Sequence, residues 1–145
     1  MNFKQITKKD NLSLKQVYFD SIISIDKNIY TQEQKRAWAS QAWDNTYFDK
    51  SINKGFGWMI YERGNIIAFA TRYPSKKIAL FYCRGDYQRQ GYGTKLLYQL
   101  EKEAKEEGQT FLTTEASLIS YKLFLKHKWT IIRKEKITIK NIIFE

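Results

Sequence analysis

The sequence predicts one α/β domain with a mixed sheet, and two observations support this fold class. Apolar strand-like segments and amphipathic helix-like segments alternate in the order β-α-α-β-β-β-α-β-α-β-β. No internal repeat and no Pro-, Gly- or Ser-rich linker divides the 145 residues, a length typical of one domain. We therefore expect a single domain over residues 1–145.

The first elements are a strand and two helical segments. Phe3–Ile6 is the first strand candidate, and Asp10 or Asn11 is placed to cap the helix that follows it. Thr31 and Gln34 have the spacing of a capping box, which predicts the start of a second helix. This helix carries Ala37, Trp38, Ala42 and Trp43, and we expect Tyr47 and Phe48 to extend the helical region.

The middle of the chain has the composition of strands. Residues 56–61 and 66–73 are rich in aromatic and β-branched side chains, and Glu62-Arg63-Gly64-Asn65 lies between them, so they predict a hairpin. Ile78–Cys83 is a nearly continuous apolar run, as expected of a central strand that is covered on both faces.

A polar loop with glycines, residues 84–94, follows the central strand and leads into a helix that Gly108 ends. Phe111–Thr114 is the next strand candidate, and Ser117 is placed to cap a further helix. Trp129–Arg133 and Lys136–Phe144 are expected to close the chain as strands, the second of which could pair across a homodimer.

Composition narrows the classes of function. A surplus of 25 basic over 15 acidic residues gives a formal charge of +10, which attracts nucleic acid, an anionic membrane or a phosphorylated ligand alike. A single cysteine, Cys83, excludes an internal disulfide and a thiolate zinc cluster, and a lone histidine, His127, builds no metal site. With no apolar leader and no apolar stretch of about 20 residues, we expect a cytoplasmic protein without a membrane or metal partner.

The polar loop at residues 84–94, before the helix that Gly108 ends, has the chemistry of an anion site. A strand that ends in a glycine loop and a helix directs free backbone N–H groups and the positive end of the helix dipole at one point. Gly91 and Gly93 allow the backbone to approach an anion closely, or they only form a tight turn. A Walker A loop would need Lys where Tyr92 stands, and a dinucleotide fingerprint would need Gly where Leu96 stands.

Two motifs in order resemble those of the GNAT acetyltransferase superfamily. Gln88, Gly91 and Gly93 match its acyl-CoA signature [R/Q]-x-x-G-x-[G/A] after a strand. The later segment Thr114-Glu115-Ala116-Ser117, followed by Tyr121, Phe124 and Trp129, is similar to its second motif. The resemblance implies an α+β fold of the acyl-CoA N-acyltransferase type with a mostly antiparallel sheet, and acetyl-CoA and an amine as partners.

The resemblance also implies the residues that bind acetyl-CoA. The backbone of the central strand would pair with the pantetheine arm, and the loop amides would take the pyrophosphate. These positions are Phe81, Tyr82 and Cys83 in the strand, Gln88, Arg89, Gln90, Gly91, Tyr92, Gly93 and Thr94 in the loop, and Ser117 and Phe124 in the second motif.

Acetyl transfer to an amine needs a base and a proton donor for the leaving thiolate. Glu115 is the nearest motif carboxylate and our candidate base, and Asp86 is a weaker one because a turn aspartate usually bonds its own backbone. The family commonly has Tyr where this chain has Phe124, so Tyr121, three residues earlier on the same helix face, is the candidate acid. Aromatic residues between Tyr30 and Phe48 lie where the family builds its acceptor pocket.

Three functions remain at this point. An acetyl-CoA-dependent N-acetyltransferase explains both motifs. A non-catalytic acyl-CoA-binding module is the alternative, because Phe124 lacks a hydroxyl group. A nucleic-acid-binding protein would use the positive charge, but no basic and aromatic signature on adjacent strands favours it.

Overall fold

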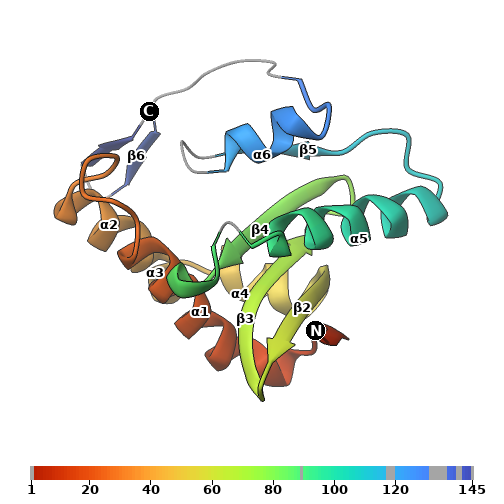
Figure 1. The fold of residues 1–145 in the computed structure, drawn as a ribbon, viewed down its shortest axis with the longest axis horizontal. Helices are drawn as coiled ribbons and strands as arrows, with labels where there is room; N and C mark the ends of the chain where they lie inside the picture. The colour runs from red at the N-terminus through yellow and green to blue at the C-terminus, as the bar shows by residue number, and fades with distance from the viewer. Residues whose placement is uncertain (1, 89, 117–119, 131–136, 140–141, 145) are drawn as a thin grey trace.

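The computed structural model describes residues 2–88, 90–116, 120–130, 137–139 and 142–144 (Figure 1). Its main sheet has the strand order β1-β2-β3-β4-β5, in which β4 and β5 are parallel and the other neighbours antiparallel. The predicted mixed, mostly antiparallel sheet is therefore confirmed. The strands are β1 (Asn2–Gln5), β2 (Phe56–Glu62), β3 (Asn65–Arg72), β4 (Lys77–Cys83) and β5 (Thr113–Thr114).

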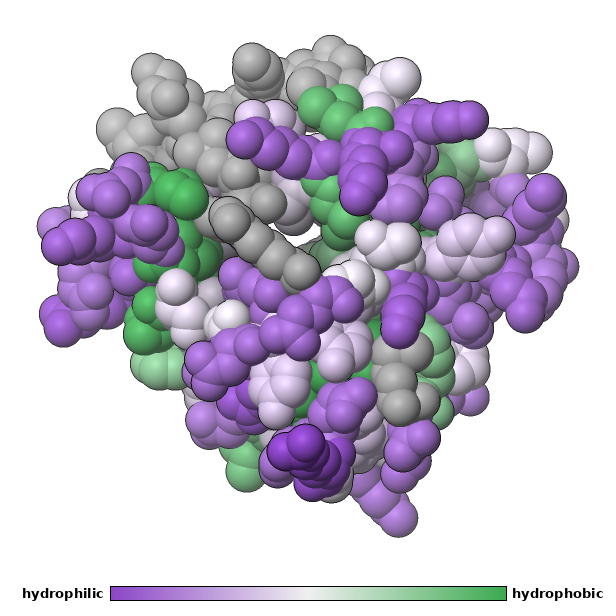
Figure 2. Space-filling model, viewed as in Figure 1, coloured by the Kyte–Doolittle hydropathy of each residue, from purple (hydrophilic) through white to green (hydrophobic). Residues whose placement is uncertain are grey.

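Helices cover both faces of the sheet. One buried cluster joins β2, β3 and β4 to α1 (Asn11–Ile23), α2 (Gln32–Ala39), α3 (Gln41–Asp44) and α4 (Tyr47–Lys54). A second buried cluster joins the opposite face to α5 (Tyr92–Glu106) and α6 (Tyr121–Lys126). The outer surface in the same view is mostly hydrophilic, with smaller hydrophobic areas between (Figure 2). No helix in the described part of the chain is long and apolar enough to cross a membrane.

Local sequence signals explain two of the turns. Arg63 and Gly64 have φ angles of 51° and 81°, which the two central residues of a tight hairpin turn require, and they join β2 to β3 as predicted. At the start of α2, Gln34 N–H donates to Thr31 Oγ1 (3.1 Å) and Thr31 N–H donates to Gln34 Oε1 (2.9 Å). The predicted capping box is confirmed.

Three boundaries differ from the sequence prediction. Asp10 stands at the N-cap of α1 without capping it, because its carboxylate accepts from the N–H (2.9 Å) and hydroxyl (3.2 Å) of Thr7 instead. The helix expected through residues 37–43 is divided at Ser40 into α2 and α3. Residues 47 and 48 are helical as expected, but they begin the separate helix α4.

The C-terminal strands also differ. Lys136–Phe144 does not form one strand, since β6 (Ile137–Ile139) and β7 (Ile142–Phe144) pair with each other as an antiparallel ribbon. In the sequence, Lys140 and Asn141 interrupt the apolar run at this point. This ribbon lies beside α2 (Figure 1) and forms a sheet of its own. In the predicted strand 129–133, residues 129 and 130 are not extended into a ladder, and the rest lie outside the described residues.

Candidate functional site

The site begins where β4 and β5 part. Their parallel pairing covers only Lys77 with Thr113 and Ile78 with Thr114, and Thr114 Oγ1 donates to the Ile78 carbonyl (3.1 Å). Within the described residues, no strand pairs with this edge of β4 after Ile78. The remaining backbone of β4 therefore keeps hydrogen-bonding groups for another partner.

The register of β3 and β4 identifies these groups. Cys83 lies opposite Ala68, and the next residue, Arg84, donates its N–H to the Ile67 carbonyl (2.8 Å). In an antiparallel ladder hydrogen-bonded and non-hydrogen-bonded pairs alternate, so Cys83 and Ala68 form a non-hydrogen-bonded pair. The N–H and C=O of Cys83 therefore face away from β3, and so do those of Phe81 two residues earlier. Both residues present backbone groups to the open edge.

A register irregularity earlier in β4 changes which face of the sheet its side chains pack on. Thr71 pairs with Leu80, but Arg72 pairs with Ile78, so β4 contains one extra residue there. As a result Ala79 and Leu80 both pack on the side of α1, instead of alternating between faces. From Phe81 onward the alternation resumes, with Phe81 toward α5 and Tyr82 toward α1.

The loop after β4 ends at the N-terminus of α5. Gly91, the N-cap, has φ 87°, a left-handed conformation that favours glycine, and a Cβ there would meet no atom within 4 Å. The first helical bond runs from Lys95 N–H to the Gly91 carbonyl (3.2 Å), so the N–H groups of Tyr92, Gly93 and Thr94 precede it. These three N–H groups and the positive end of the helix dipole lie together at the start of α5, an arrangement that suits a pyrophosphate.

Side chains hold this loop in place. Gln88 Nε2 donates to the Cys83 carbonyl (3.1 Å), and Gln90 Nε2 donates to the Asp86 carbonyl (3.0 Å). Asp20 of α1 accepts from Gly85 N–H (3.1 Å), a contact between residues 65 positions apart that no local sequence signal announces. Gln88 and Gln90 therefore shape the loop through contacts of their own. Arg89 lies outside the described residues.

α6 packs directly over the start of α5. A Cβ on Gly93 would lie 3.1 Å from Leu123 Cδ2 and 3.5 Å from Phe81 Cε1, so the absence of a side chain lets the two helices and β4 meet. Thr94 Oγ1 lies 3.2 Å from His127 Nε2 at the end of α6. Tyr92 is half-buried against the second core cluster, and its hydroxyl donates to Glu62 Oε1 (3.4 Å).

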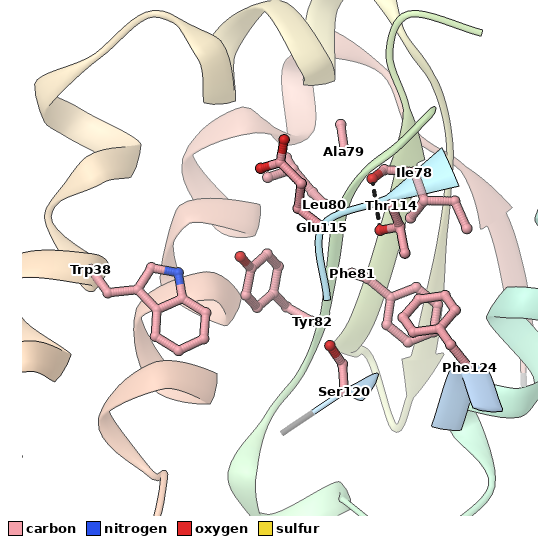
Figure 3. Close-up of a pocket in the computed structure, with 10 residues that line it drawn as sticks. All are labelled: Trp38, Ile78, Ala79, Leu80, Phe81, Tyr82, Thr114, Glu115, Ser120 and Phe124. Atoms are coloured by element: carbon pink, nitrogen blue, oxygen red, sulfur yellow. Dashed lines mark hydrogen bonds between the residues drawn. The ribbon is translucent and has the colours of Figure 1, made fainter. Parts of the chain in front are cut away.

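A hollow that is open to solvent lies between β4, β5, α2 and the start of α6 (Figure 3). Trp38 and Tyr82 are on one side of β4, and the rings of Phe81 and Phe124 are on the other. Its described lining residues are Trp38, Ile78, Ala79, Leu80, Phe81, Tyr82, Thr114, Glu115, Ser120 and Phe124. Glu115 is the only one of these ten that is charged at neutral pH.

Glu115 has a cationic neighbour. Its Oε1 lies 3.2 Å from Lys77 Nζ, and the two side chains are 70% and 31% exposed. Burial lowers the pKa of Lys77, but the hydrogen bond with Glu115, together with the interactions with Tyr47 and the charge of Glu115, outweighs burial and raises this pKa above its ordinary value. Lys77 is therefore a stable cation beside the Glu115 carboxylate at the mouth of the hollow.

Tyr82 lines the hollow with a neutral hydroxyl group. Burial raises its pKa to about 12, although a hydrogen bond with Trp38 acts in the opposite direction. The centroid of its ring lies 4.7 Å from that of Tyr18 and 5.9 Å from that of Phe69. The phenol therefore stays protonated near neutral pH and is fixed by its aromatic neighbours.

Of the candidate residues on α6 in the second motif, Phe124 lines the hollow and Tyr121 does not. Phe124 is buried, with its ring centroid 5.5 Å from that of Phe81, and lines the hollow. Tyr121 is half-buried in the first turn of α6, directly after the lining residue Ser120, but it is not itself one of the ten lining residues. Ser117 lies outside the described residues, and Ser120 holds the N-cap position of α6.

The thiol of Cys83 is not a nucleophile here. It is half-buried, and burial together with the charge of Asp20 raises its pKa to about 11, which keeps it protonated near neutral pH. No group of three His, Cys, Asp or Glu side chains among the described residues could hold a metal ion.

We compared the chain with curated proteins, solved structures and protein families. No curated protein matches the sequence significantly. A "GCN5-Related N-acetyltransferase: Aminotransferase, Class-II" from Rhodopseudomonas palustris is similar in structure, with a TM-score of 0.90, 24% identity and coverage of 99% of this chain and 89% of that one.

Two similar structures contain the ligand that the motifs suggest. The paia N-acetyltransferase from Thermoplasma acidophilum, in complex with coenzyme A, has a TM-score of 0.67 and 16% identity over 88% of this chain and 89% of that one. A predicted acetyltransferase from Clostridium acetobutylicum with acetyl-CoA has a TM-score of 0.62 and 21% identity over 92% of each chain. These likenesses establish the fold. Because the model of the acetyltransferase (GNAT) family matches residues 19–129, the chain belongs to that family.

Proposed function

We propose that residues 1–145 form one N-acetyltransferase domain, which moves an acetyl group from acetyl-CoA to a primary amine of a small molecule or peptide by direct transfer in a ternary complex. The open edge of β4 beside the α5 N-terminus is the observation that carries this proposal. The edge offers backbone groups to an extended amide chain, and the helix end offers N–H groups to a pyrophosphate.

Acetyl-CoA supplies an activated acyl group and a thiolate leaving group. The N–H groups of Phe81 and Cys83 face the open edge, and we assign them to the pantetheine arm and to the thioester carbonyl oxygen, where negative charge develops. Tyr92, Gly93 and Thr94 donate their N–H groups to the pyrophosphate. Phe81 and Phe124 give the arm an apolar wall.

The transfer itself forms a C–N bond and breaks the C–S bond. We assign Glu115, at the mouth of the hollow, as the base that removes a proton from the amine, directly or through water. We assign the hydroxyl of Tyr121 as the proton donor to the departing thiolate. The acceptor nitrogen loses two protons in all, one when the ammonium becomes the neutral amine and one when the amide forms, and the thiolate gains one from Tyr121. Glu115 returns its proton to solvent and Tyr121 regains one, so the net reaction releases one proton from the ammonium form of the acceptor.

Phe124 favours a second candidate function. A buried ring without a hydroxyl lines the hollow where the family commonly has Tyr, which is compatible with a module that binds acyl-CoA without catalysis.

Calorimetry with acetyl-CoA, followed by a thiol-release assay with a broad panel of amines, separates the two functions. Binding with thiol release is expected for the enzyme, and binding without release identifies the module. Absence of acetyl-CoA binding contradicts both.

Replacement of the base tests the mechanism. Glu115→Gln is expected to lower kcat about 100-fold or more and to remove the acidic limb of the pH–rate profile, because the amide accepts no proton. Calorimetry should show an unchanged affinity for acetyl-CoA. The matched control is Glu33→Gln on α2, an exposed glutamate outside the hollow, which should leave kcat unchanged. An unaltered kcat in Glu115→Gln would remove this residue from the mechanism.

A further inference from the structure

The acceptor side of the hollow is an aromatic wall. Trp38 comes from α2 and Tyr82 from β4, and the two ring centroids lie 6.3 Å apart. In Figure 3 the indole and the phenol lie together, apart from the Phe81 and Phe124 rings across the strand. Leu80 adds an apolar side chain to this region. A flat or bulky apolar group has a complementary surface here.

The wall is held by residues behind it. The Tyr18 hydroxyl donates to the Trp38 carbonyl (2.8 Å), and the Tyr30 ring packs edge-on against Trp38 at 5.5 Å. Tyr18 also packs edge-on against Tyr82 at 4.7 Å. Because Tyr18 and Tyr30 are both buried, both wall residues are fixed before any ligand binds.

The charges at the wall favour a single cation. Glu115 is the one charged residue among the ten described lining residues, and Lys77 already lies 3.2 Å from it. A molecule with several ammonium groups would find one carboxylate among these ten lining residues, and the Lys77 ammonium beside it would repel the other positive charges. A monoamine places its one nitrogen near Glu115 and the rest of the molecule against the rings.

We propose that Trp38 and Tyr82 form an acceptor subsite that selects primary amines with one positive charge on an aromatic or bulky apolar group, and that disfavours polycationic amines. This inference rests on the proposed function. Trp38 is the specificity-determining residue, because its indole face offers the apolar arm a stacking surface, while Glu115 receives the amine.

The test compares 2-phenylethylamine with spermidine and kanamycin. Calorimetry measures the binding of each amine to the CoA-loaded protein, and thiol release measures kcat/KM. We expect 2-phenylethylamine to exceed both polycations about tenfold in each measurement, which is near the upper end of the effect that one aromatic contact provides. Equal or preferred use of the polycations would overturn the inference.

Variants assign the effect to the wall. Trp38→Leu should lower kcat/KM and affinity for 2-phenylethylamine at least about tenfold, with little change for ethylamine and in acetyl-CoA affinity. Trp43→Leu is the matched control, because Trp43 is 47% exposed and does not line the hollow. An equal loss for both amines, or an equal effect of both variants, would overturn the assignment of Trp38. The wild-type comparison decides the selectivity even if Trp38→Leu does not fold.

The two levels of inference fail differently. Binding of 2-phenylethylamine to the CoA-loaded protein without thiol release from any amine supports the subsite and contradicts the transferase. Thiol release with other amines, together with absent binding of 2-phenylethylamine, contradicts the subsite and supports the transferase.

Discussion

At the scale of single residues, Cys83 gives a direct test of the environment around β4. Burial and the charge of Asp20 raise its pKa to about 11, against an ordinary value of 9.0. The reactive species is the thiolate, so at pH 8 the folded protein should react with iodoacetamide about 100-fold more slowly than the protein unfolded in urea. Mass spectrometry of timed samples measures both rates.

The pH dependence of this reaction follows from the same shift. A raised pKa means that the folded thiol stays protonated as the pH rises through 9, so its alkylation rate should keep rising about tenfold per pH unit to about pH 10. In the unfolded chain the rate should level off near pH 9. Equal rates in the two states would contradict the burial of Cys83.

Residue types alone indicated part of the site. Glu115 and Phe124 do line the hollow, and of the aromatic residues expected near the acceptor pocket only Trp38 lines it, while Trp43 and Tyr47 are exposed and Tyr30 is in the core. The contact of Asp20 with Gly85 and the ion pair of Lys77 with Glu115 carry no sequence signal. They depend on residues that only the folded chain brings together.

At the scale of elements, variants of two glycines with the same backbone conformation distinguish an effect on stability from an effect on ligand binding. Gly91 at the α5 N-terminus and Gly64 in the β2–β3 turn have φ angles of 87° and 81°, and a Cβ on either meets open space. Gly91→Ala and Gly64→Ala should therefore each lower the free energy of unfolding by about 1–2 kcal/mol, the cost of a left-handed L-residue.

Only one of the two glycines belongs to the proposed anion site. Acetyl-CoA affinity, measured by calorimetry on the folded variants, should fall in Gly91→Ala, where the added methyl group and the altered loop oppose close approach of the pyrophosphate. Gly64→Ala should keep the wild-type affinity. If both variants bind acetyl-CoA equally well, the loop before α5 is not the pyrophosphate site.

Element types were easier to predict than element ends. The β2–β3 hairpin, the start of α2 and the end of α5 at Gly108, with φ 85°, follow from short-range signals that the fold retains. The break at Ser40 does not, because the apolar period continues through it in the sequence. Likewise β5 is limited to two residues by its divergence from β4, which is a long-range property.

At the scale of the whole molecule, one buried cation fastens α5 to the sheet. Arg72 of β3 is fully buried and pairs with Glu103 of α5 and with Glu107, the C-cap residue of that helix. Glu103 also accepts from Trp58 Nε1 (2.9 Å). Arg72→Met should lower the free energy of unfolding by about 3–5 kcal/mol, because it leaves partly buried carboxylates without their cation. Urea denaturation followed by circular dichroism measures the loss.

A partly exposed ion pair provides the comparison. Lys15 Nζ lies 3.2 Å from Asp49 Oδ1, and the two side chains are 13% and 44% exposed. Asp49 stays in contact with water and also accepts from Asn11 Nδ2 (3.0 Å), so Lys15→Met should cost less than about 1 kcal/mol. Similar losses in the two variants would mean that the Arg72 contacts do not fasten α5.

The fold class of the whole chain could be predicted because the order of strands and helices, together with two spaced motifs, restricts the topology strongly. The placement of the C-terminal ribbon beside α2 could not be predicted, since apolar β-branched residues such as Ile137 and Ile142 fit either that position or an edge of the main sheet.

The two-residue contact between β4 and β5 has a consequence for the life of the protein in a cell. On the proposed function, acetyl-CoA makes some of the backbone hydrogen bonds that a longer pairing of β4 with β5 would make. The bound ligand therefore stabilises this part of the fold, and the stabilisation is lost when the ligand leaves. Mass action then ties the stability of the C-terminal half to the concentration of acetyl-CoA. Because coenzyme A carries the same pantetheine arm and pyrophosphate, both forms of the ligand would stabilise the protein, and a cell short of both would hold a less stable one.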